Sequence, residues 1–221
     1  MSTATPNLAA PRWPVHIAAC ALFAVLFALA TWLDAPLYRA LLSPAPNLLE
    51  SRDWYRTLRI LGSMFIWLGV ATVFVLIDSS RALGPSMLGP RATWTRGPFL
   101  LVSAGLAGLL AEALKLLLRR GRPIDHDAAY AFTPWSFALE TSDFGLPSSH
   151  AAVAFAAAFA LSHLHPRAGV VFILGAIGCG LTRVLVGQHF VSDVVAGAAV
   201  GYAVPAVITW LHQRASLNRP K

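Results

Sequence analysis

The sequence predicts an all-α membrane protein, a polytopic bundle of six transmembrane helices. Hydrophobic residues make up 57% of the 221 residues and charged residues only 12%, whereas soluble domains average about 45–50% and 25%. Long apolar runs recur along the chain, and a helix of about 20 apolar residues crosses a hydrocarbon core of roughly 30 Å. The six predicted spans are residues 14–33, 58–77, 98–118, 149–164, 168–187 and 191–211.

The first and fourth runs are the ones that admit another interpretation. Arg12 precedes the first run and Ala28-Leu29-Ala30 resembles a signal-peptide cleavage site, but the length of about 20 residues favours a retained span. The fourth run is the shortest and is rich in Ala. We find no repeat and no long linker, so residues 1–221 are expected to form a single membrane-embedded domain.

Tryptophan positions support the same segmentation. An amphipathic indole ring suits the headgroup region of a membrane, and six of the seven Trp lie at or just outside predicted helix ends. These six are Trp13, Trp32, Trp54, Trp94, Trp135 and Trp210. Only Trp67 lies within a span.

The net charge of +7 favours an anionic lipid partner. The cations lie in short loops without interleaved aromatic residues, so nucleic acid is not expected as a partner. Cys20 and Cys179 both lie in predicted spans, where they are expected to pack as small residues and not to form a disulfide. The oligomeric state is left open.

Positive charges also predict an orientation. With six spans, both termini share a side with the connections near residues 81–96 and 167, and that side carries eight Lys and Arg. The opposite side carries six once the three cations of the site described below are set aside. Because cytoplasmic loops are enriched in Lys and Arg, the termini are expected in the cytoplasm and the site outside.

Two features of the connections and helix surfaces bear on packing. The longest connections, residues 34–56 and 119–147, lie on the same side and are expected to cover a site. Gly197 and Gly201 form a small face in the last helix, which predicts close packing against a neighbouring helix.

Ionisable side chains gather at one end of the predicted bundle. Buried charge is costly, so such residues in or beside spans are candidates for function. Antiparallel threading brings the end of the third helix, the start of the fourth, the end of the fifth and the start of the sixth to one side. The residues concerned are Lys115 and Arg122, then Ser148, Ser149 and His150, then Arg183, then His189 and Asp193.

The spacing of these residues suggests how they share the site. Lys115 and Arg122 are seven residues apart and face one direction, with Arg119, if the helix continues to Gly121. His189 and Asp193 are four apart, so the carboxylate can hold one imidazole nitrogen.

The chemistry expected of such a set is phosphate chemistry. Three cations suit a phosphate dianion, and Ser148 with the amides at the start of the fourth helix can donate to its oxygens. One imidazole, oriented by a carboxylate, can attack phosphorus while a second protonates the leaving oxygen.

The pattern of these motifs resembles the type 2 phosphatidic acid phosphatase superfamily, the membrane lipid phosphatase branch related to vanadium haloperoxidases. The resemblance rests on three motifs in order between residues 115 and 193. These are Lys115-x6-Arg122-Pro123, Pro147-Ser148-Ser149-His150 and Thr182-Arg183-x5-His189-x3-Asp193.

The resemblance implies a role for each residue. His189 is implied as the nucleophile that forms a phosphohistidine, Asp193 as its orienting partner and His150 as the general acid. Phosphate binding is implied for Lys115, Arg122, Ser148, Ser149 and Arg183. No metal and no cofactor are implied. Two positions depart from the family pattern: Ser149 replaces a usual Gly, which places a Cβ near the phosphate, and Thr182 replaces a usual Ser.

Other charged residues have plainer interpretations. Glu112 is expected to neutralise Lys115, and Arg119 and Arg120 are expected to anchor lipid headgroups or contact substrate. Residues 125–127, an Asp-His-Asp triplet, are expected to be a solvated turn and not a metal site. His163 and His165 are expected at the end opposite the site.

The function expected from the resemblance is metal-independent dephosphorylation of a membrane lipid phosphate or pyrophosphate in a bacterial inner membrane. Undecaprenyl pyrophosphate, phosphatidylglycerol phosphate, phosphatidic acid and lipid A 1-phosphate are the candidate substrates. A phosphotransferase that passes phosphate or a headgroup to an acceptor lipid is the alternative enzyme, and a lipid-phosphate binder or transporter is the non-enzymatic alternative.

Overall fold

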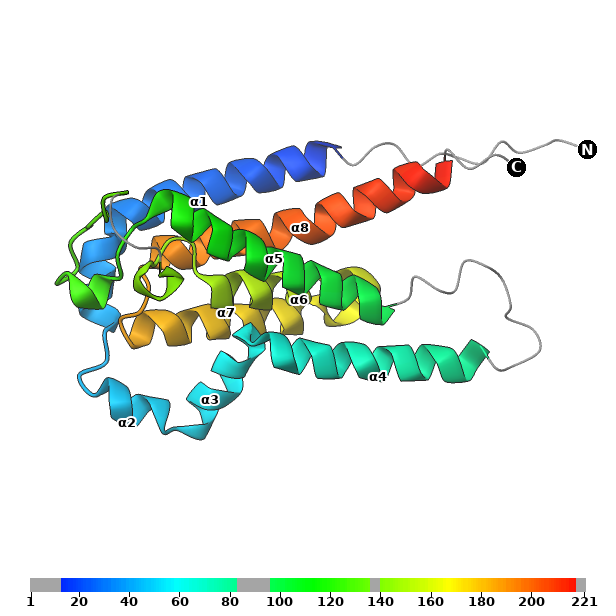
Figure 1. The fold of residues 1–221 in the computed structure, drawn as a ribbon, viewed down its shortest axis with the longest axis horizontal. Helices are drawn as coiled ribbons and strands as arrows, with labels where there is room; N and C mark the ends of the chain where they lie inside the picture. Colours follow the sequence, from blue (N-terminus) through cyan, green and yellow to red (C-terminus); the bar gives the residue numbers. More distant parts are fainter. Residues whose placement is uncertain (1–12, 83–95, 136–139, 218–221) are drawn as a thin grey trace, which may run out of the picture.

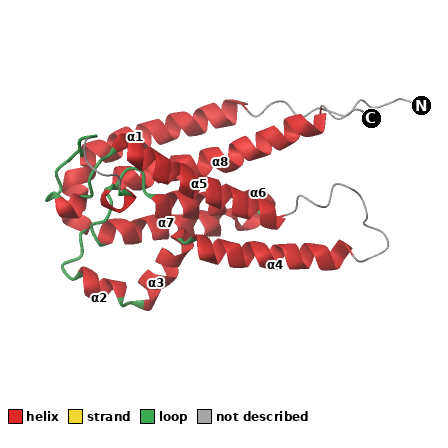
Figure 2. Cartoon of the chain, viewed as in Figure 1, coloured by secondary structure: helices red, strands yellow, loops and turns green. Residues whose placement is uncertain are grey.

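The computed structural model describes residues 13–82, 96–135 and 140–217 and shows a bundle of helices (Figure 1). The described part contains no strand, only two isolated bridges that pair Arg120 with Phe132 and Gly121 with Phe144 (Figure 2). The predicted all-α class is confirmed. The α-helices are α1 Trp13–Leu41, α2 Pro46–Glu50, α3 Asp53–Arg59, α4 Met64–Ala82, α5 Arg96–Leu118, α6 Ser149–Leu164, α7 Gly169–Leu185 and α8 Val191–Leu217. Short 3-10 turns occupy Ile60–Gly62, Pro123–Asp125, Thr141–Asp143 and Pro166–Ala168.

The short, Ala-rich helix α6 forms the centre of the bundle. It packs against α5, α7 and α8, and most of its residues from Ala151 to Leu161 are buried. A helix that is apolar all round is stable when other helices surround it, and Ala side chains allow those neighbours to approach closely. The Ala-rich composition of this short run is therefore that of a helix in the core of the bundle.

The predicted number of six spans is not confirmed. By length and composition, four of the described segments can cross a membrane: α1, α5, α7 with the turn before it, and α8. The bent pair made of Asp53–Gly62 and Met64–Ser79 gives a fifth. α6 has 16 residues and extends about 24 Å, which is less than the hydrocarbon thickness.

The prediction of one continuous span over residues 58–77 is wrong. The chain breaks at Ser63, and the segments on either side are bent by 72°. Gly62 explains the position of the break, because a Cβ there would lie 2.7 Å from the His150 Cβ and 3.0 Å from the Cys179 Sγ. The backbone therefore contacts α6 and α7 at Gly62 and then turns away as α4.

The connection predicted as a long loop, residues 34–56, is mostly helical. α1 continues past the predicted end at residue 33, through Pro36, to Leu41. α2 and α3 then follow at the lower left of Figure 1. Asp34 consequently lies inside α1 and is buried, although the sequence placed it at the start of a loop.

The glycine face predicted on the last helix is confirmed as a packing surface. A Cβ at Gly197 would lie 2.5 Å from the Ser148 carbonyl oxygen, and one at Gly201 would lie 2.8 Å from the Ala152 carbonyl oxygen. The absence of side chains lets α8 lie directly against α6, and this contact fixes where α8 begins relative to Ser148.

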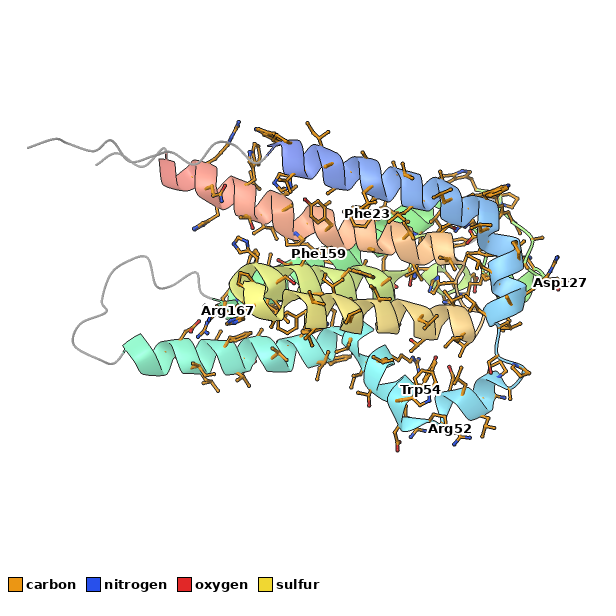
Figure 3. All side chains as sticks on the ribbon, turned by 180° about the vertical axis from the view of Figure 1, so that it is seen from behind. Phe23, Arg52, Trp54, Asp127, Phe159 and Arg167 are labelled. Carbon is orange, nitrogen blue, oxygen red and sulfur yellow. The ribbon has the colours of Figure 1, made fainter. Side chains whose placement is uncertain are left out.

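Aromatic side chains join α1 to α8 and α6. Tyr202 of α8 contacts Phe23 of α1 and Phe159 of α6, with ring centroids 5.7 and 5.2 Å apart, and Figure 3 shows these two Phe on either side of α8. The first and last helices also meet through Trp13 and Trp210 at 6.1 Å. Trp67, the one Trp predicted within a span, is buried, whereas Trp94 lies outside the described residues.

The prediction that the cysteines pack as small residues fits Cys179, which is buried, but not Cys20, which is exposed on α1. Four of the cations that predict the orientation lie outside the described residues: Arg12, Arg91, Arg219 and Lys221.

Candidate active site

Four helix ends converge at one end of the bundle, as the antiparallel threading predicts. In Figure 1 α5 and α7 end there and α6 and α8 begin there. Direct contacts join the ends: the Ser148 amide donates to the Asp193 carbonyl oxygen at 3.0 Å, and the Lys115 ammonium donates to the Ser149 hydroxyl at 3.1 Å.

Lys115 occupies the last turn of α5 and is 4% exposed. Besides Ser149, its ammonium group contacts the Glu112 carboxylate at 2.9 Å. The expectation that Glu112 neutralises Lys115 is thus met by the geometry. Ser149 is the first residue of α6 and adopts regular helical conformation, so its Cβ is accommodated.

The predicted end of the third span at residue 118 is confirmed, and the helix does not continue to Gly121. α5 ends at Leu118, and Arg119 has a left-handed backbone with φ of 53°. Its guanidinium lies over the rings of Trp135 and Phe144, at 5.1 and 5.5 Å. Lys115, Arg119 and Arg122 therefore do not share a helical face.

Arg122 reaches the site from the loop that follows this turn. Its guanidinium donates to the Gln188 side-chain oxygen, next to His189 in the chain. The left-handed turn at Arg119 thus redirects the chain so that Arg122 approaches the start of α8 and not the axis of α5.

The start of α6 carries Ser148 and His150. Ser148 is the N-cap, and its hydroxyl accepts from the Ala151 amide at 3.4 Å. This hydroxyl therefore stabilises the helix start, which is the usual role of an N-cap Ser. His150 is half-buried and packs against Gly62.

Arg183 lies in the last turn of α7 and is 6% exposed. Its Nε has no hydrogen-bond partner among the described residues. None of the ion pairs among these residues includes Arg183 or Arg122. A buried Arg183 and a half-buried Arg122 in this state favour an anion in the site. The neighbouring Thr182 hydroxyl donates to the Cys179 carbonyl oxygen at 2.6 Å, so it is engaged within its own helix.

His189 lies just before α8 and is 2% exposed. Its Nδ1 is 2.9 Å from the Gly145 carbonyl oxygen and 3.6 Å from the Asp193 Oδ2. Both neighbours are acceptors, so Nδ1 carries the proton and Nε2 keeps a lone pair. Burial lowers the pKa of His189, and the Asp193 hydrogen bond and charge oppose that shift without reversing it.

Asp193 is held mainly by groups that the sequence did not indicate. The Arg120 guanidinium donates to its Oδ1 in a buried ion pair, and the Phe190 amide donates to its Oδ2 at 2.8 Å. Arg120 is 3% exposed, so it is not the headgroup anchor that was expected. Asp34 of α1 also reaches this region, through hydrogen bonds with Ser192.

The signal for Asp34 and Arg120 was partly present in the sequence. Asp34 is an ionisable residue at the end of an apolar run, which is itself a marker of function. Arg120 is one of three Arg within residues 119–122, and the sequence alone does not show which of them is buried against a partner.

The remaining candidates lie away from the site. Residues 125–127 form an exposed turn, and Asp127 projects outward in Figure 3. No group of three or more potential metal ligands occurs in the described residues. His163 and His165 lie at the other end of α6 and contact the rings of Phe99 and Phe74.

A groove of about 460 Å³ runs beside the site between α4, α5 and α6. His150, Ser149 and Glu112 form its polar end. The rest of the lining is small or apolar, and it includes Leu109, which is 69% exposed on the outside of the bundle. The groove thus connects the polar site with the apolar surface. The other lining residues are Gly62, Met64, Gly105, Gly108 and Val153.

Comparison with known proteins gives a consistent result. Residues 98–217 match the PAP2 superfamily. The lipid A 1-phosphatases of Rhizobium etli and Rhizobium johnstonii are each 46% identical over 110 residues, which is 48% of this chain and 45% and 43% of those proteins. The chain thus spans less than half the length of these curated relatives. The crystal structure of Aquifex aeolicus LpxE matches 80% of this chain and 95% of its own, with a TM-score of 0.55 and 20% identity, and supports the fold.

Proposed function

The chain belongs to the PAP2 superfamily, and on this basis we propose that it is a membrane-bound lipid phosphatase that cleaves a phosphate monoester through a phosphohistidine. The observation that carries the proposal is His189. Its Nδ1 faces two acceptors, which leaves Nε2 as a nucleophile beside buried cations. Binding alone does not require an imidazole oriented in this way.

In the first step, the His189 Nε2 lone pair attacks phosphorus and the bond from phosphorus to the lipid oxygen breaks. His150 donates its proton to that oxygen, so the lipid leaves as an alcohol. The product is a phosphohistidine. The ring of His189 gains positive charge in this step, and the nearby Asp193 carboxylate stabilises it.

In the second step, His150 takes a proton from water, and the resulting hydroxide attacks the phosphohistidine. The bond between phosphorus and Nε2 breaks, inorganic phosphate leaves and His189 is restored. This step gives His150 opposite roles in the two halves of the reaction, as acid and then as base.

Phosphate binding is assigned to Lys115, Arg122 and Arg183. Within the described part of the chain no carboxylate pairs with Arg183 or Arg122, and Lys115 has only a partly exposed partner, so a phosphate dianion balances the local charge. Ser149 positions the Lys115 ammonium, and Ser148 caps the helix whose first amides face the site. These residues and the surrounding helices act as one domain over residues 1–221.

The groove beside His150 supports a lipid as the substrate. Its apolar part suits an acyl or prenyl chain and its polar end suits the phosphate. The names of the two Rhizobium relatives make lipid A 1-phosphate the first candidate to test. We further propose that the chain lies in a bacterial inner membrane with cytoplasmic termini and with the site on the outer face.

The test is phosphate release by the purified protein in detergent. The substrates are lipid A, phosphatidic acid, phosphatidylglycerol phosphate and undecaprenyl pyrophosphate. We expect release from lipid A and a loss of at least about 1,000-fold in His189→Ala, because the nucleophile is removed. His163→Ala removes a His at the other end of the same bundle and is expected to keep wild-type activity.

Two outcomes would contradict the proposal. Equal turnover by His189→Ala and the wild type would exclude His189 as the nucleophile. Loss of the lipid phosphate without release of inorganic phosphate, together with a new phosphorylated lipid, would identify a phosphotransferase.

A further inference from the structure

A buried polar network connects α1 to the candidate nucleophile. It runs from Asp34 of α1 through Ser192 to Arg120 and on to Asp193. Asp34, Ser192 and Asp193 are at most 1% exposed and Arg120 is 3% exposed. Charges buried to this degree persist only when paired and hydrogen-bonded, so these residues depend on one another.

Arg120 controls both groups that face the Nδ1 of His189. Its guanidinium binds the Asp193 carboxylate, and its main-chain carbonyl oxygen accepts from the Gly145 amide at 2.7 Å. The Gly145 carbonyl oxygen is in turn the acceptor 2.9 Å from Nδ1. One residue thus places the carbonyl and the carboxylate that orient the ring.

Asp34 completes this arrangement from a different helix. Its carboxylate accepts from the Ser192 amide at 3.0 Å, from the Ser192 hydroxyl and from the Tyr130 hydroxyl at 2.8 Å. The Ser192 hydroxyl is also 2.7 Å from the Arg120 guanidinium. Arg120 is enclosed further by the rings of Tyr130 and Phe190, at 4.9 and 5.4 Å.

The charges in the network suit the proposed chemistry. Asp34 and Asp193 supply two negative charges and Arg120 one positive charge, so one negative charge remains to offset the positive charge that His189 acquires. Without Asp34, Arg120 would neutralise Asp193 and no charge would remain for the ring. The other charged or titratable groups around His189 are Lys115 of α5, His150 of α6 and Arg183 of α7.

We infer that Arg120 and Asp34 are positioning residues for the nucleophile: Arg120 fixes Asp193 and Gly145 around the imidazole, and Asp34 holds Arg120 through Ser192 and restores the negative charge of the site. The inference rests on the proposed function of His189. Asp34 lies outside residues 98–217, which match the family, so α1 contributes a functional residue and not only a membrane anchor.

The test compares variants that change charge with variants that preserve it. Asp34→Asn keeps the shape of the side chain and one oxygen acceptor, but it replaces the other oxygen by an amide donor. Arg120→Gln removes the positive charge and Arg120→Lys keeps it, and both side chains are shorter than Arg. We expect kcat to fall about 10- to 100-fold in all three, as for other partners that orient a functional imidazole. KM is expected to stay within about twofold, because none of these residues contacts phosphate.

The pH profile of kcat separates positioning from general damage. Asp34→Asn removes negative charge near His189 and favours the neutral ring, so the acid limb moves to lower pH by about half a unit. Arg120→Gln removes positive charge and moves that limb to higher pH. Arg120→Lys leaves the limb in place. A merely structural role would not shift the two limbs in opposite directions.

The matched control is Asp78→Asn, which breaks the ion pair between Asp78 and Arg96 at the other end of the bundle. It is expected to keep wild-type kcat and the wild-type limb. If Asp34→Asn does not fold, Tyr130→Phe decides, since this residue is 43% exposed and its loss removes one hydrogen bond from Asp34. That variant is expected to lower kcat about threefold.

The outcomes also separate this inference from the function on which it rests. If the wild type releases no phosphate from any lipid, the proposed function fails. If the wild type is active but folded Asp34→Asn or Tyr130→Phe matches Asp78→Asn in kcat and in the acid limb, the inference is wrong and the proposed function stands.

Discussion

His189 is almost completely withdrawn from solvent, and this burial lowers its pKa more than the Asp193 carboxylate raises it. The imidazole is therefore neutral near pH 7, where an unperturbed His with a pKa of about 6.5 is already partly protonated. A neutral ring with its proton on Nδ1 is the form that can attack phosphorus. The same burial that makes the residue costly to protonate thus keeps it ready for reaction.

This shift predicts a pH dependence of stability. As the pH falls below about 6.5, the unfolded chain binds a proton at His189 before the folded protein does. The stabilisation is therefore fully present above that value and is lost as the pH falls toward the folded pKa. Thermal unfolding of the wild type and of His189→Gln in detergent, between pH 7.5 and 5, should show the wild type losing stability relative to the variant. Parallel curves would show that His189 is not protected from protonation.

For single residues, the sequence motifs predicted which side chains form the site better than they predicted what those side chains contact. Lys115, Arg183 and His189 are buried at converging helix ends, as their spacing suggested. The sequence predicted Asp193 as the partner of the His189 imidazole, but the Gly145 carbonyl oxygen lies nearer to Nδ1 than the Asp193 carboxylate does. Gly145 is 44 residues away in the chain, and a carbonyl group leaves no mark in a sequence. The burial of Arg120 could not be predicted, because it depends on the ion pair with Asp193. That pair forms only when the chain folds.

Helix boundaries at the site end depend on residues that are far away in the chain. α5 ends at Leu118 because the chain turns into the left-handed region at Arg119, and the break at Ser63 follows from the contact between Gly62 and His150. Hydropathy predicted the first boundary, since the predicted span also ends at residue 118, but not the break at Ser63, because the chain is apolar on both sides of it. Hydropathy also predicted the long apolar interiors of α5 and α8, because a side chain is apolar whether it is buried against lipid or against protein.

The contact between α6 and α8 gives a prediction for the smallest possible change. In Gly197→Ala, the new Cβ would lie 2.5 Å from the Ser148 carbonyl oxygen, and we expect a loss of about 1–3 kcal/mol in stability. In Gly69→Ala no atom lies within 4 Å of the new Cβ, so higher helix propensity should leave stability equal or increased. Thermal unfolding of both in detergent measures the difference. A similar loss in both variants would contradict close packing at Gly197.

The candidate active site lies at one end of the whole molecule, and both described ends of the chain lie at the other. The site and the loop residues 119–135 and 140–148 lie at one end of the bundle, and α1 begins and α8 ends at the other (Figure 1). A membrane protein with this arrangement exposes phosphate chemistry to one compartment only. The proposed orientation makes that compartment the outside of the cell.

The orientation can be measured by labelling single cysteines. In a chain with Cys20→Ala and Cys179→Ala, the exposed residues Ser142, near the site, and Arg167, beyond α6, are replaced one at a time by Cys. A membrane-impermeant maleimide is expected to label Ser142→Cys in intact spheroplasts and Arg167→Cys only after lysis. The reverse pattern would place the site in the cytoplasm. Labelling of both in intact cells would mean that α6 does not separate two compartments.

Under the proposed function, the groove between α4, α5 and α6 determines how substrate and products travel. A lipid that enters past Leu109 reaches His150 without leaving the bilayer, so its encounter with the enzyme is a search in two dimensions. The quantity that governs the rate is then the mole fraction of substrate among neighbouring lipids, and dilution with inert lipid slows turnover at constant bulk concentration. After cleavage the two products part: the lipid alcohol diffuses back into the membrane plane, and the phosphate departs into water.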